Sequence, residues 1–120
     1  MIGYVDGQLR ALIDVSISPT KAGSHESVEV WIDTAFNGGL VMPRELIHKL
    51  GLKTASSTDA ILADGQLVEL ETFSCYLEWF GHGYRTQVIA NDGEIPLLGT
   101  VLLSNRRLLI DYATKLVTLD

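Results

Sequence analysis

The sequence lacks the features that stabilise small secreted proteins or carry a chain across a membrane. It contains one cysteine, Cys75, so no disulfide can form within the chain. No window approaches the roughly 20 apolar residues that a membrane helix needs. Met1 to Arg10 lacks the basic region and apolar run of a signal peptide. These absences lead us to expect a soluble cytoplasmic protein with no membrane partner.

Positive charge is also scarce. The chain has 9 Lys and Arg against 15 Asp and Glu, a net charge of -6, and Arg106-Arg107 is its one pair of adjacent cations. Nucleic-acid binding requires a cationic face, so we expect no nucleic-acid partner. The sequence has neither a Gly-x-Ser-x-Gly motif nor a phosphate-binding loop, which leaves serine hydrolases and nucleotide-binding proteins unsupported.

No metal or cofactor is expected. His25, His48 and His82 are scattered, and together with Cys75 they lack the close spacing of metal ligands. Cys75 is predicted to be a small core residue because it lies in the middle of an apolar strand. The large aromatic side chains are predicted to pack in the core or at an interface: Trp31, Trp79, Phe80 and Tyr84.

What the sequence does contain is typical of one globular all-β domain spanning residues 1–120. Hydrophobic residues make up 47% and charged residues 20%, which excludes intrinsic disorder. Asp6-Gly7, Asp64-Gly65 and Asp92-Gly93 each separate apolar or alternating segments and predict three hairpins, since Asp-Gly supplies the positive φ angles of tight turns.

The spacing of apolar residues predicts the strands and helices of most of the remaining chain. Apolar residues in alternation predict strands, which we place at Leu9–Ile17, Val28–Asp33, Ala60–Leu62, Gln66–Phe80, Tyr84–Ala90, Leu108–Ile110 and Leu116–Leu119. Pro43 begins a predicted helix that presents Leu46, Ile47 and Leu50 on one face and ends at Gly51. A second short helix is predicted over Val101–Asn105.

The segment that indicates catalytic chemistry is Asp33-Thr34-Ala35, where Asp33 directly follows Ile32 at the end of the strand predicted from Val28. A carboxylate at the end of a strand, on a tight loop, is held firmly by the strand's backbone. By itself the tripeptide has an alternative interpretation, an Asx-type turn in which Asp33 only caps backbone N–H groups. A second apolar segment, Ile95 to Thr100, repeats the order of strand, tight loop and helix about sixty residues later.

Together these segments resemble the retropepsin-like aspartic proteases, particularly small bacterial single-domain members. The similarity covers nearly the whole chain and rests on Ile32-Asp33-Thr34-Ala35-Phe36-Asn37-Gly38, the polar hairpin tip Ala63–Gln66 and Leu97-Leu98-Gly99. It implies an all-β, closed β-barrel-like acid protease fold. That fold has one or two short helices and a flap hairpin, and it forms a single-domain half of a pepsin-like architecture.

The resemblance also implies roles for individual residues. Asp33 matches the catalytic aspartate, Thr34 the residue that braces the two active-site loops, and Ala35 the usual glycine. Asp64 and Gly65 match the flap tip that closes over an extended peptide, and Leu98 and Gly99 match the segment beside the catalytic loop. Alanine at position 35 would be strained if its φ were positive.

One aspartate loop is not enough for the reaction. Hydrolysis of a peptide by an activated water uses two carboxylates that share one proton, and the chain offers one such loop. We therefore expect a homodimer that brings together Asp33 of each subunit and acts as an aspartic endopeptidase. The alternative is a dimeric peptide-binding or assembly module without activity. The presence of Ala35 in place of the usual glycine favours this alternative.

Two further expectations concern surfaces. The substrate pockets are expected to be apolar and lined by Val30, Leu62, Leu67 and Leu98. The dimer interface is expected at the terminal strands Ile2–Val5 and Val117–Leu119 or at loops near Asn105-Arg106, so that deletion of Leu116–Asp120 should give an inactive monomer.

Overall fold

A computed structural model of the chain describes residues 1–61, 65 and 67–120, and the side chains of residues 1–55, 65 and 71–120. Its strands are β1 (Ile2–Val5), β2 (Ala11–Ser18), β3 (Glu26–Ile32), β4 (Leu40–Pro43), β5 (Lys53–Ile61), β6 (Leu67–Trp79), β7 (His82–Asn91), β8 (Leu97–Leu98), β9 (Leu108–Asp111) and β10 (Leu116–Leu119). The helices are α1 (Arg44–Leu50) and α2 (Thr100–Leu103). The all-β prediction with two short helices is therefore confirmed.

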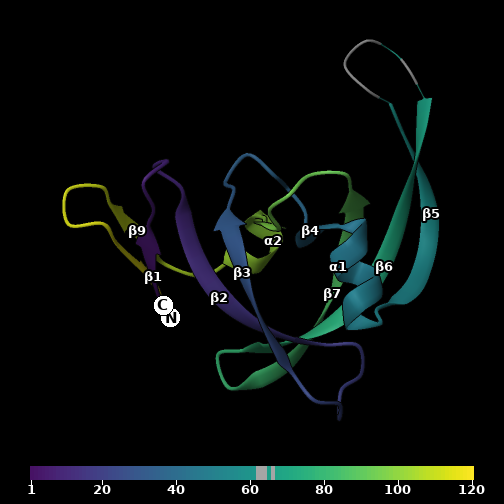
Figure 1. Cartoon of the computed structure of the whole chain (residues 1–120), viewed down its shortest axis with the longest axis horizontal. Helices are drawn as coiled ribbons and strands as arrows, with labels where there is room; N and C mark the ends of the chain where they lie inside the picture. The colour runs from purple at the N-terminus through teal and green to yellow at the C-terminus, as the bar shows by residue number, and fades with distance from the viewer. Residues whose placement is uncertain (62–64, 66) are drawn as a thin grey trace.

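The strands form one sheet in the order β5-β6-β7-β4-β8-β3-β2-β1-β10-β9. An additional pairing of β6 with β2 makes the sheet close on itself, so that β6, β7, β4, β8, β3 and β2 form a ring. β5 and β6 make a long antiparallel hairpin that projects from the rest of the molecule (Figure 1). The two termini lie side by side, where β1 pairs with β10 (Figure 1).

The core fills the inside of this ring and follows the predicted alternation. Along β3, Val28, Val30 and Ile32 are buried while the residues between them are exposed, and Cys75 is completely buried on β6. On β2 the expected Ala11, Ile13, Val15 and Ile17 are buried, but so is Leu12 on the opposite face. Leu12 lies between Tyr4 on β1 and Trp31 on β3, whose side chains flank it.

Helix α1 begins and ends as its residues predict. Pro43 precedes it with φ of -58°, and Gly51 follows it in the left-handed conformation with φ of 69°. The N–H of Gly51 donates to the carbonyl of His48 at 3.1 Å, which satisfies one of the carbonyls left free at the end of a helix. Ile47 and Leu50 are buried, so the apolar face packs into the core.

The prediction of three hairpins at Asp-Gly pairs was only partly right. The β5–β6 hairpin turns at Gly65, which has φ of 85°. The β1–β2 hairpin contains Asp6-Gly7, but its positive φ of 63° belongs to Leu9, which is exposed in the turn and not part of β2. Asp92-Gly93 makes no hairpin, because β7 and β8 are separated by β4.

Two strands differ from the prediction for the same physical reason. β4 was missed, and β5 begins at Lys53 and not at Ala60. β4 runs parallel to β7 and antiparallel to β8, and β5 pairs with β6, so both are held by neighbours far away in the sequence. Neither segment alternates clearly, and tertiary pairing decides such cases over local propensity. In the described part of the chain no helix is long and apolar enough to span a bilayer.

Candidate active site

Asp33 lies directly after β3 and is fixed by the neighbouring strand. β3 and β8 run parallel, with Trp31 opposite Leu97 and Ile32 opposite Leu98. The N–H of Trp31 donates to the carbonyl of Pro96 at 2.8 Å, and the N–H of Asp33 donates to the carbonyl of Leu98 at 2.9 Å. The backbone of Asp33 is therefore part of the sheet's hydrogen-bond ladder, and its side chain, which is half-buried, starts from a rigid point.

The loop after Asp33 turns around its carboxylate. The N–H of Ala35 donates to Oδ1 of Asp33 at 2.9 Å, and the N–H of Phe36 donates to the Asp33 carbonyl at 3.2 Å. This is the Asx-type turn considered above as an alternative. It uses only Oδ1, and Oδ2 accepts no hydrogen bond from any residue that the structure describes. The turn thus orients the carboxylate and leaves one oxygen available for another partner.

The second predicted segment lies against this loop. The N–H of Gly99 donates to the carbonyl of Gly39 at 2.8 Å, and the N–H of Thr100 donates to the carbonyl of Phe36, also at 2.8 Å. A Cβ on Gly99 would lie 2.7 Å from the Phe36 carbonyl oxygen, which is closer than real contacts allow. The two backbones can approach this closely only because residue 99 is glycine.

Leu98 contributes through its backbone. Its carbonyl holds Asp33, whereas its side chain is completely buried in the core. Val30 is also completely buried. The prediction that Val30 and Leu98 line an open substrate pocket was therefore wrong, because both side chains point to the inside of the ring. Leu62 lies outside the described residues, and the side chain of Leu67 lies outside the described side chains.

A hollow of about 410 Å³ opens at Asp33. Trp31, Leu97 and the loop from Asp33 to Ala35 line it, and Thr34 and Ala35 are exposed. Arg10 lies over the indole ring of Trp31 at 5.8 Å from its centre, a distance typical of a cation–π contact. The sequence analysis missed Trp31 and Leu97 as lining residues. Their place opposite each other at the ends of β3 and β8 is the signal that could have identified them.

Ala35 fits its position without strain. Its φ lies outside the left-handed region, which among the described non-glycine residues is adopted by Leu9, Phe80, Asn105 and Lys115. The strain considered for an alanine at this position is therefore absent.

Of the two residues predicted at the hairpin tip, the structure describes Gly65. Gly65 is exposed and does not line the hollow at Asp33, and Asp64 lies outside the described residues. Among the described side chains no group of three His, Cys, Asp or Glu is placed to hold a metal ion.

Comparison with known proteins gives the fold. The sequence matches no protein-family model and no curated protein. The structure is similar to a retropepsin-like aspartic protease from Rickettsia conorii, with a TM-score of 0.67 and 17% identity over 99% of this chain and 88% of that one. It is also similar to EIAV protease in complex with the inhibitor HBY-793, with a TM-score of 0.58 and 16% identity over 83% of this chain and 90% of that one. The chain therefore has a retropepsin-like fold.

Proposed function

We propose that the chain is an aspartic endopeptidase in which Asp33 is the catalytic residue. The observation that carries this proposal is the Asp33 carboxylate, which is fixed at a strand end and oriented through Oδ1. Its Oδ2 lies beside an open hollow and accepts no hydrogen bond from the described part of the chain. A residue that served only to cap the turn would need no hollow in front of it. The retropepsin-like fold adds support, because two proteases share it.

The active protein in this proposal is a homodimer. Each subunit supplies one Asp33, and the segment that lies beside its loop, Ile95 to Thr100, contains no acidic residue that could serve as the second carboxylate. A two-fold axis near the loop would place the two Asp33 carboxylates about 3 Å apart, the distance at which two carboxyl groups share one proton. The pair would titrate as a unit, so neither pKa would belong to one subunit.

In this proposal the ionised carboxylate takes a proton from a water molecule, whose oxygen attacks the peptide carbonyl carbon. The protonated carboxyl group donates its proton to the carbonyl oxygen, which gives a neutral tetrahedral intermediate. The carboxyl group that took the water proton then donates it to the amide nitrogen, and a hydroxyl proton of the intermediate passes to the other carboxylate as the C–N bond breaks. Both products leave without a covalent intermediate, and the shared proton returns to the pair.

The remaining predicted residues have supporting roles. Thr34 is exposed next to Asp33, where its hydroxyl could be reached by the other subunit's loop, and Ala35 donates its N–H to the carboxylate. Leu98 and Gly99 position the loop through their backbones. The substrate would bind as an extended strand between the hollow and the hairpin that carries Asp64 and Gly65. Trp31 and Leu97 would then contact its side chains.

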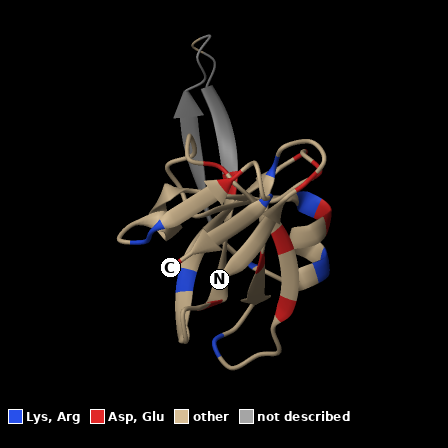
Figure 2. Ribbon diagram, turned by 90° about the vertical axis from the view of Figure 1, so that its left-hand side faces the viewer, with Lys and Arg blue, Asp and Glu red and all other residues tan. Residues whose placement is uncertain are grey.

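The second subunit requires a surface, and the strands at the termini offer one. Ile2 and Tyr4 on β1 and Leu109 and Leu116 on β9 and β10 are exposed by 44% to 77%. The strand register puts these four side chains, which we call the terminal face, on the same side of the sheet. Figure 2 looks at the side of the molecule that bears both termini and shows few charged residues on the strands there.

The terminal face continues toward the proposed site. Tyr4 lies opposite Leu116 on one side and Leu12 on the other, and Leu12 lies opposite Trp31. This row of side chains ends at Trp31, which is one of the residues that line the Asp33 hollow. A second copy docked on the terminal face would thus come close to Asp33, and burial of exposed apolar side chains would stabilise the dimer.

The terminal strands themselves are paired within the chain. β1 lies between β2 and β10, and β10 lies between β1 and β9, so their backbone groups have partners already. Val117 and Leu119 are completely buried. Deletion of Leu116–Asp120 would therefore remove part of the core, and it cannot serve as a test of dimerisation.

The alternative function is a dimeric peptide-binding or assembly module. Its support in the sequence is Ala35, and the unstrained φ of Ala35 removes the physical reason for expecting an inactive site. No other observation favours this alternative.

The experiment that tests the proposal compares the protein with its Asp33→Asn variant on a mixed peptide library, with products read by mass spectrometry from acid to neutral pH. We expect cleavage that the variant loses by about 100- to 10,000-fold, because asparagine can neither take nor donate the proton. An Asp14→Asn variant is the matched control, since Asp14 is exposed in β2 away from the hollow. Cleavage that persists in Asp33→Asn would exclude the mechanism.

A further inference from the structure

A second hollow collects positive charge in this acidic chain. Two adjoining depressions of about 270 Å³ each share Ser74 and Arg85 in their lining. Lys21, Lys53, Thr20 and Tyr76 line one of them. We call the site formed by these six residues the basic hollow. None of its residues lines the hollow at Asp33, so it is a separate site.

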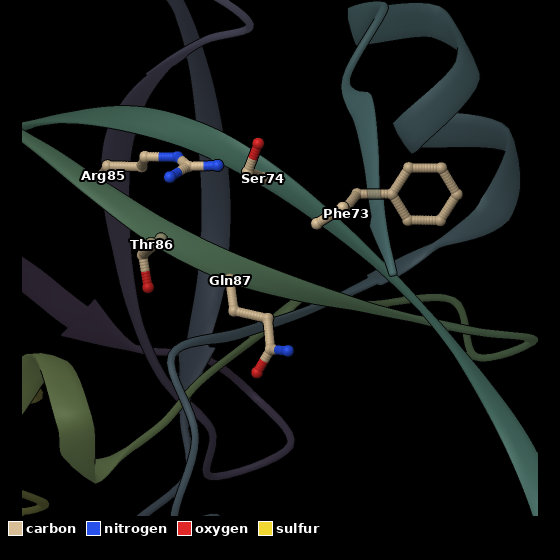
Figure 3. A pocket seen from close by; sticks show the side chains of 6 residues that line it. Phe73, Ser74, Arg85, Thr86 and Gln87 are labelled. Atoms are coloured by element: carbon tan, nitrogen blue, oxygen red, sulfur yellow. The ribbon is translucent and has the colours of Figure 1, made fainter. Parts of the chain in front are cut away.

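Three elements converge on β6 to build it. Lys53 on β5 lies opposite Ser74 in the strand register, and Arg85 on β7 lies opposite Tyr76. Figure 3 shows the Arg85 guanidinium extending toward Ser74, while Phe73 points away from both. These four positions are on strands of the same sheet, so their spacing is fixed by the ladder hydrogen bonds.

The third cation comes from the loop between β2 and β3. Ser18, the last residue of β2, lies opposite Tyr76 of β6. Its hydroxyl donates to the carbonyl of Thr20 at 2.7 Å, and the N–H of Thr20 approaches the same hydroxyl oxygen at 3.3 Å. Ser18 thus holds the start of the loop against β6 and keeps Lys21 at the rim of the basic hollow.

Among the side chains that the structure describes, no carboxylate compensates the charges of the basic hollow. It holds three of the nine Lys and Arg residues, and no Asp or Glu lines either depression. Across the described part of the chain, ion pairs are made by Arg10 with Asp6 and by Arg44 with Glu71 and Asp92, and none by Lys21, Lys53 or Arg85. The nearest acidic residues along β6 are Glu71, three residues before Ser74, and Glu78, two residues after Tyr76, and neither lines the depressions.

We propose that the basic hollow binds a small, multiply charged anion of the phosphate class. Three cations that face one hollow repel one another, and an anion seated among them replaces this repulsion by attraction. The Arg85 guanidinium can donate two parallel hydrogen bonds to an oxyanion, and each lysine adds a point charge. The hydroxyls of Thr20, Ser74 and Tyr76 add neutral donors at the same place.

The restricted size of the cationic area selects a small anion. Of the six other Lys and Arg residues, Arg10 and Arg44 face carboxylates and Arg106 lies over the ring of Phe80 at 3.6 Å. Lys49, Arg107 and Lys115 line neither depression. A nucleic acid would need a longer cationic track. A bound anion would also connect the base of the β5–β6 hairpin, at Lys53 and Ser74, with the β2–β3 loop and β7.

The experiment is a titration followed by isothermal calorimetry and by backbone amide NMR, at about 10 mM ionic strength, where the Debye length is about 30 Å. Inorganic pyrophosphate and glycerol 3-phosphate are the two probes, and they distinguish a free inorganic anion from a phosphate carried by an organic molecule. We expect saturable binding of at least one probe, with shifts centred on Lys21, Ser74 and Arg85. We also expect a rise of the thermal midpoint, since the ligand binds only the folded chain.

Substitutions decide whether binding is specific. Lys53→Gln and Arg85→Gln should each weaken binding by about tenfold or more, because each removes a charge-assisted hydrogen bond. Lys115→Gln removes the same charge from the β9–β10 turn and should leave the affinity within about twofold. The Asp33→Asn variant should bind as the unchanged protein does, so the result does not depend on the proposed protease activity. Absence of saturable binding by both probes, or equal weakening by Lys53→Gln, Arg85→Gln and Lys115→Gln, would overturn the proposal.

Discussion

Gly99 is the residue at which the fold depends most directly on the absence of a side chain. Its φ of -102° is open to any residue, so the requirement for glycine is purely steric. The closest atoms to a Cβ at this position belong to the backbone and ring of Phe36 and to the backbone of Gly38. These atoms are part of the loop that follows Asp33 and cannot move away without disturbing it.

We predict that Gly99→Ala destabilises the protein by about 1–3 kcal/mol, the usual effect of forcing an extra methyl group into a packed region. Urea denaturation of the variant measures the change in the free energy of unfolding. Gly83→Ala is the matched control, because Gly83 has open space around its Cβ position and no positive φ. A Gly99→Ala variant as stable as the unchanged protein would contradict the close approach described here.

Cys75 provides a test of the core at the same scale. Its side chain is completely buried on β6, and desolvation raises its pKa to about 12. Since the thiolate is the reactive form, we predict that the folded protein reacts with a disulfide reagent such as Ellman's only as fast as it unfolds. The rate should rise in step with the unfolded fraction as urea is added. Rapid, complete labelling without denaturant would show that the core is open at β6.

The prediction of site residues from sequence succeeded where a backbone constraint is local. The position of Asp33 after an alternating strand predicted a fixed carboxylate, and the hydrogen bonds from Ala35 and to Leu98 account for it. The contribution of Trp31 could not be predicted, because which face of β3 meets the hollow depends on β8, whose Leu97 pairs with Trp31 from 66 residues further along the chain. Val30 and Leu98 were misassigned as lining residues for the same reason.

The turn between β1 and β2 is an element whose stability depends on pH. Asp6 accepts a hydrogen bond from the Arg10 side chain at 2.7 Å and further bonds from the N–H groups of Arg10 and Gln8. The Arg10 side chain is the largest cause that lowers the pKa of Asp6 below its ordinary value of 3.8, and these backbone bonds add to it. The ionised form is thus favoured in the folded state.

The direction in which pH changes the stability follows from the linkage between protonation of Asp6 and folding. Because the folded-state pKa lies below 3.8, the contribution of Asp6 to stability is present above pH 3.8 and is lost as the pH falls through the lower, folded-state value. We predict that Asp6→Asn lowers the free energy of unfolding at neutral pH and that the difference from the unchanged protein shrinks below pH 3.8. Urea midpoints at several pH values measure this.

Glu26→Gln serves as the control for the turn, because Glu26 is exposed at the start of β3, lies opposite the uncharged Ile17 and makes no ion pair with the residues that the structure describes. Its free energy of unfolding should stay close to that of the unchanged protein at neutral pH. An Asp6→Asn difference that grows as the solution is acidified would show that the carboxylate does not stabilise the turn in its ionised form.

At the same scale, elements with a regular pattern were predictable and elements defined by distant partners were not. Helix α1 was found because Pro43 and Gly51 bound an apolar face of the right spacing. β4 was missed because its apolar run Leu40–Met42 does not alternate, and its existence depends on the space between β7 and β8. Asp92-Gly93 was taken for a hairpin turn because the sequence alone does not show that β4 separates the flanking strands.

At the scale of the whole molecule, the proposed homodimer needs a surface that joins its two subunits. The terminal face of Ile2, Tyr4, Leu109 and Leu116 is exposed in the single chain, and its row of side chains continues to Trp31 beside Asp33. The hydroxyl of Tyr4 donates to a carboxylate oxygen of Glu29 at 2.9 Å, which orients the ring at the edge of this face.

We predict that Leu116→Lys and Leu109→Lys each shift the protein from dimer to monomer and abolish cleavage, while the fold is kept. A lysine would place a charge in the apolar interface, at a position where the single chain is open to water. Sedimentation velocity measures the assembly, and circular dichroism checks the fold. Tyr84→Lys introduces the same charge at an exposed aromatic residue outside the terminal face and should leave the dimer intact. A dimer that survives both leucine substitutions would exclude the terminal face as the interface.

The most direct test of the account mixes subunits. The protein and its Asp33→Asn variant are unfolded together in equal amounts and refolded, and the peptide-cleaving activity is measured per total protein. If each active site needs Asp33 from both subunits, only dimers of two unchanged chains cleave, and the activity is about one quarter of that of the unmixed protein. A value of about one half would mean that each subunit acts alone, which would contradict the shared carboxylate pair.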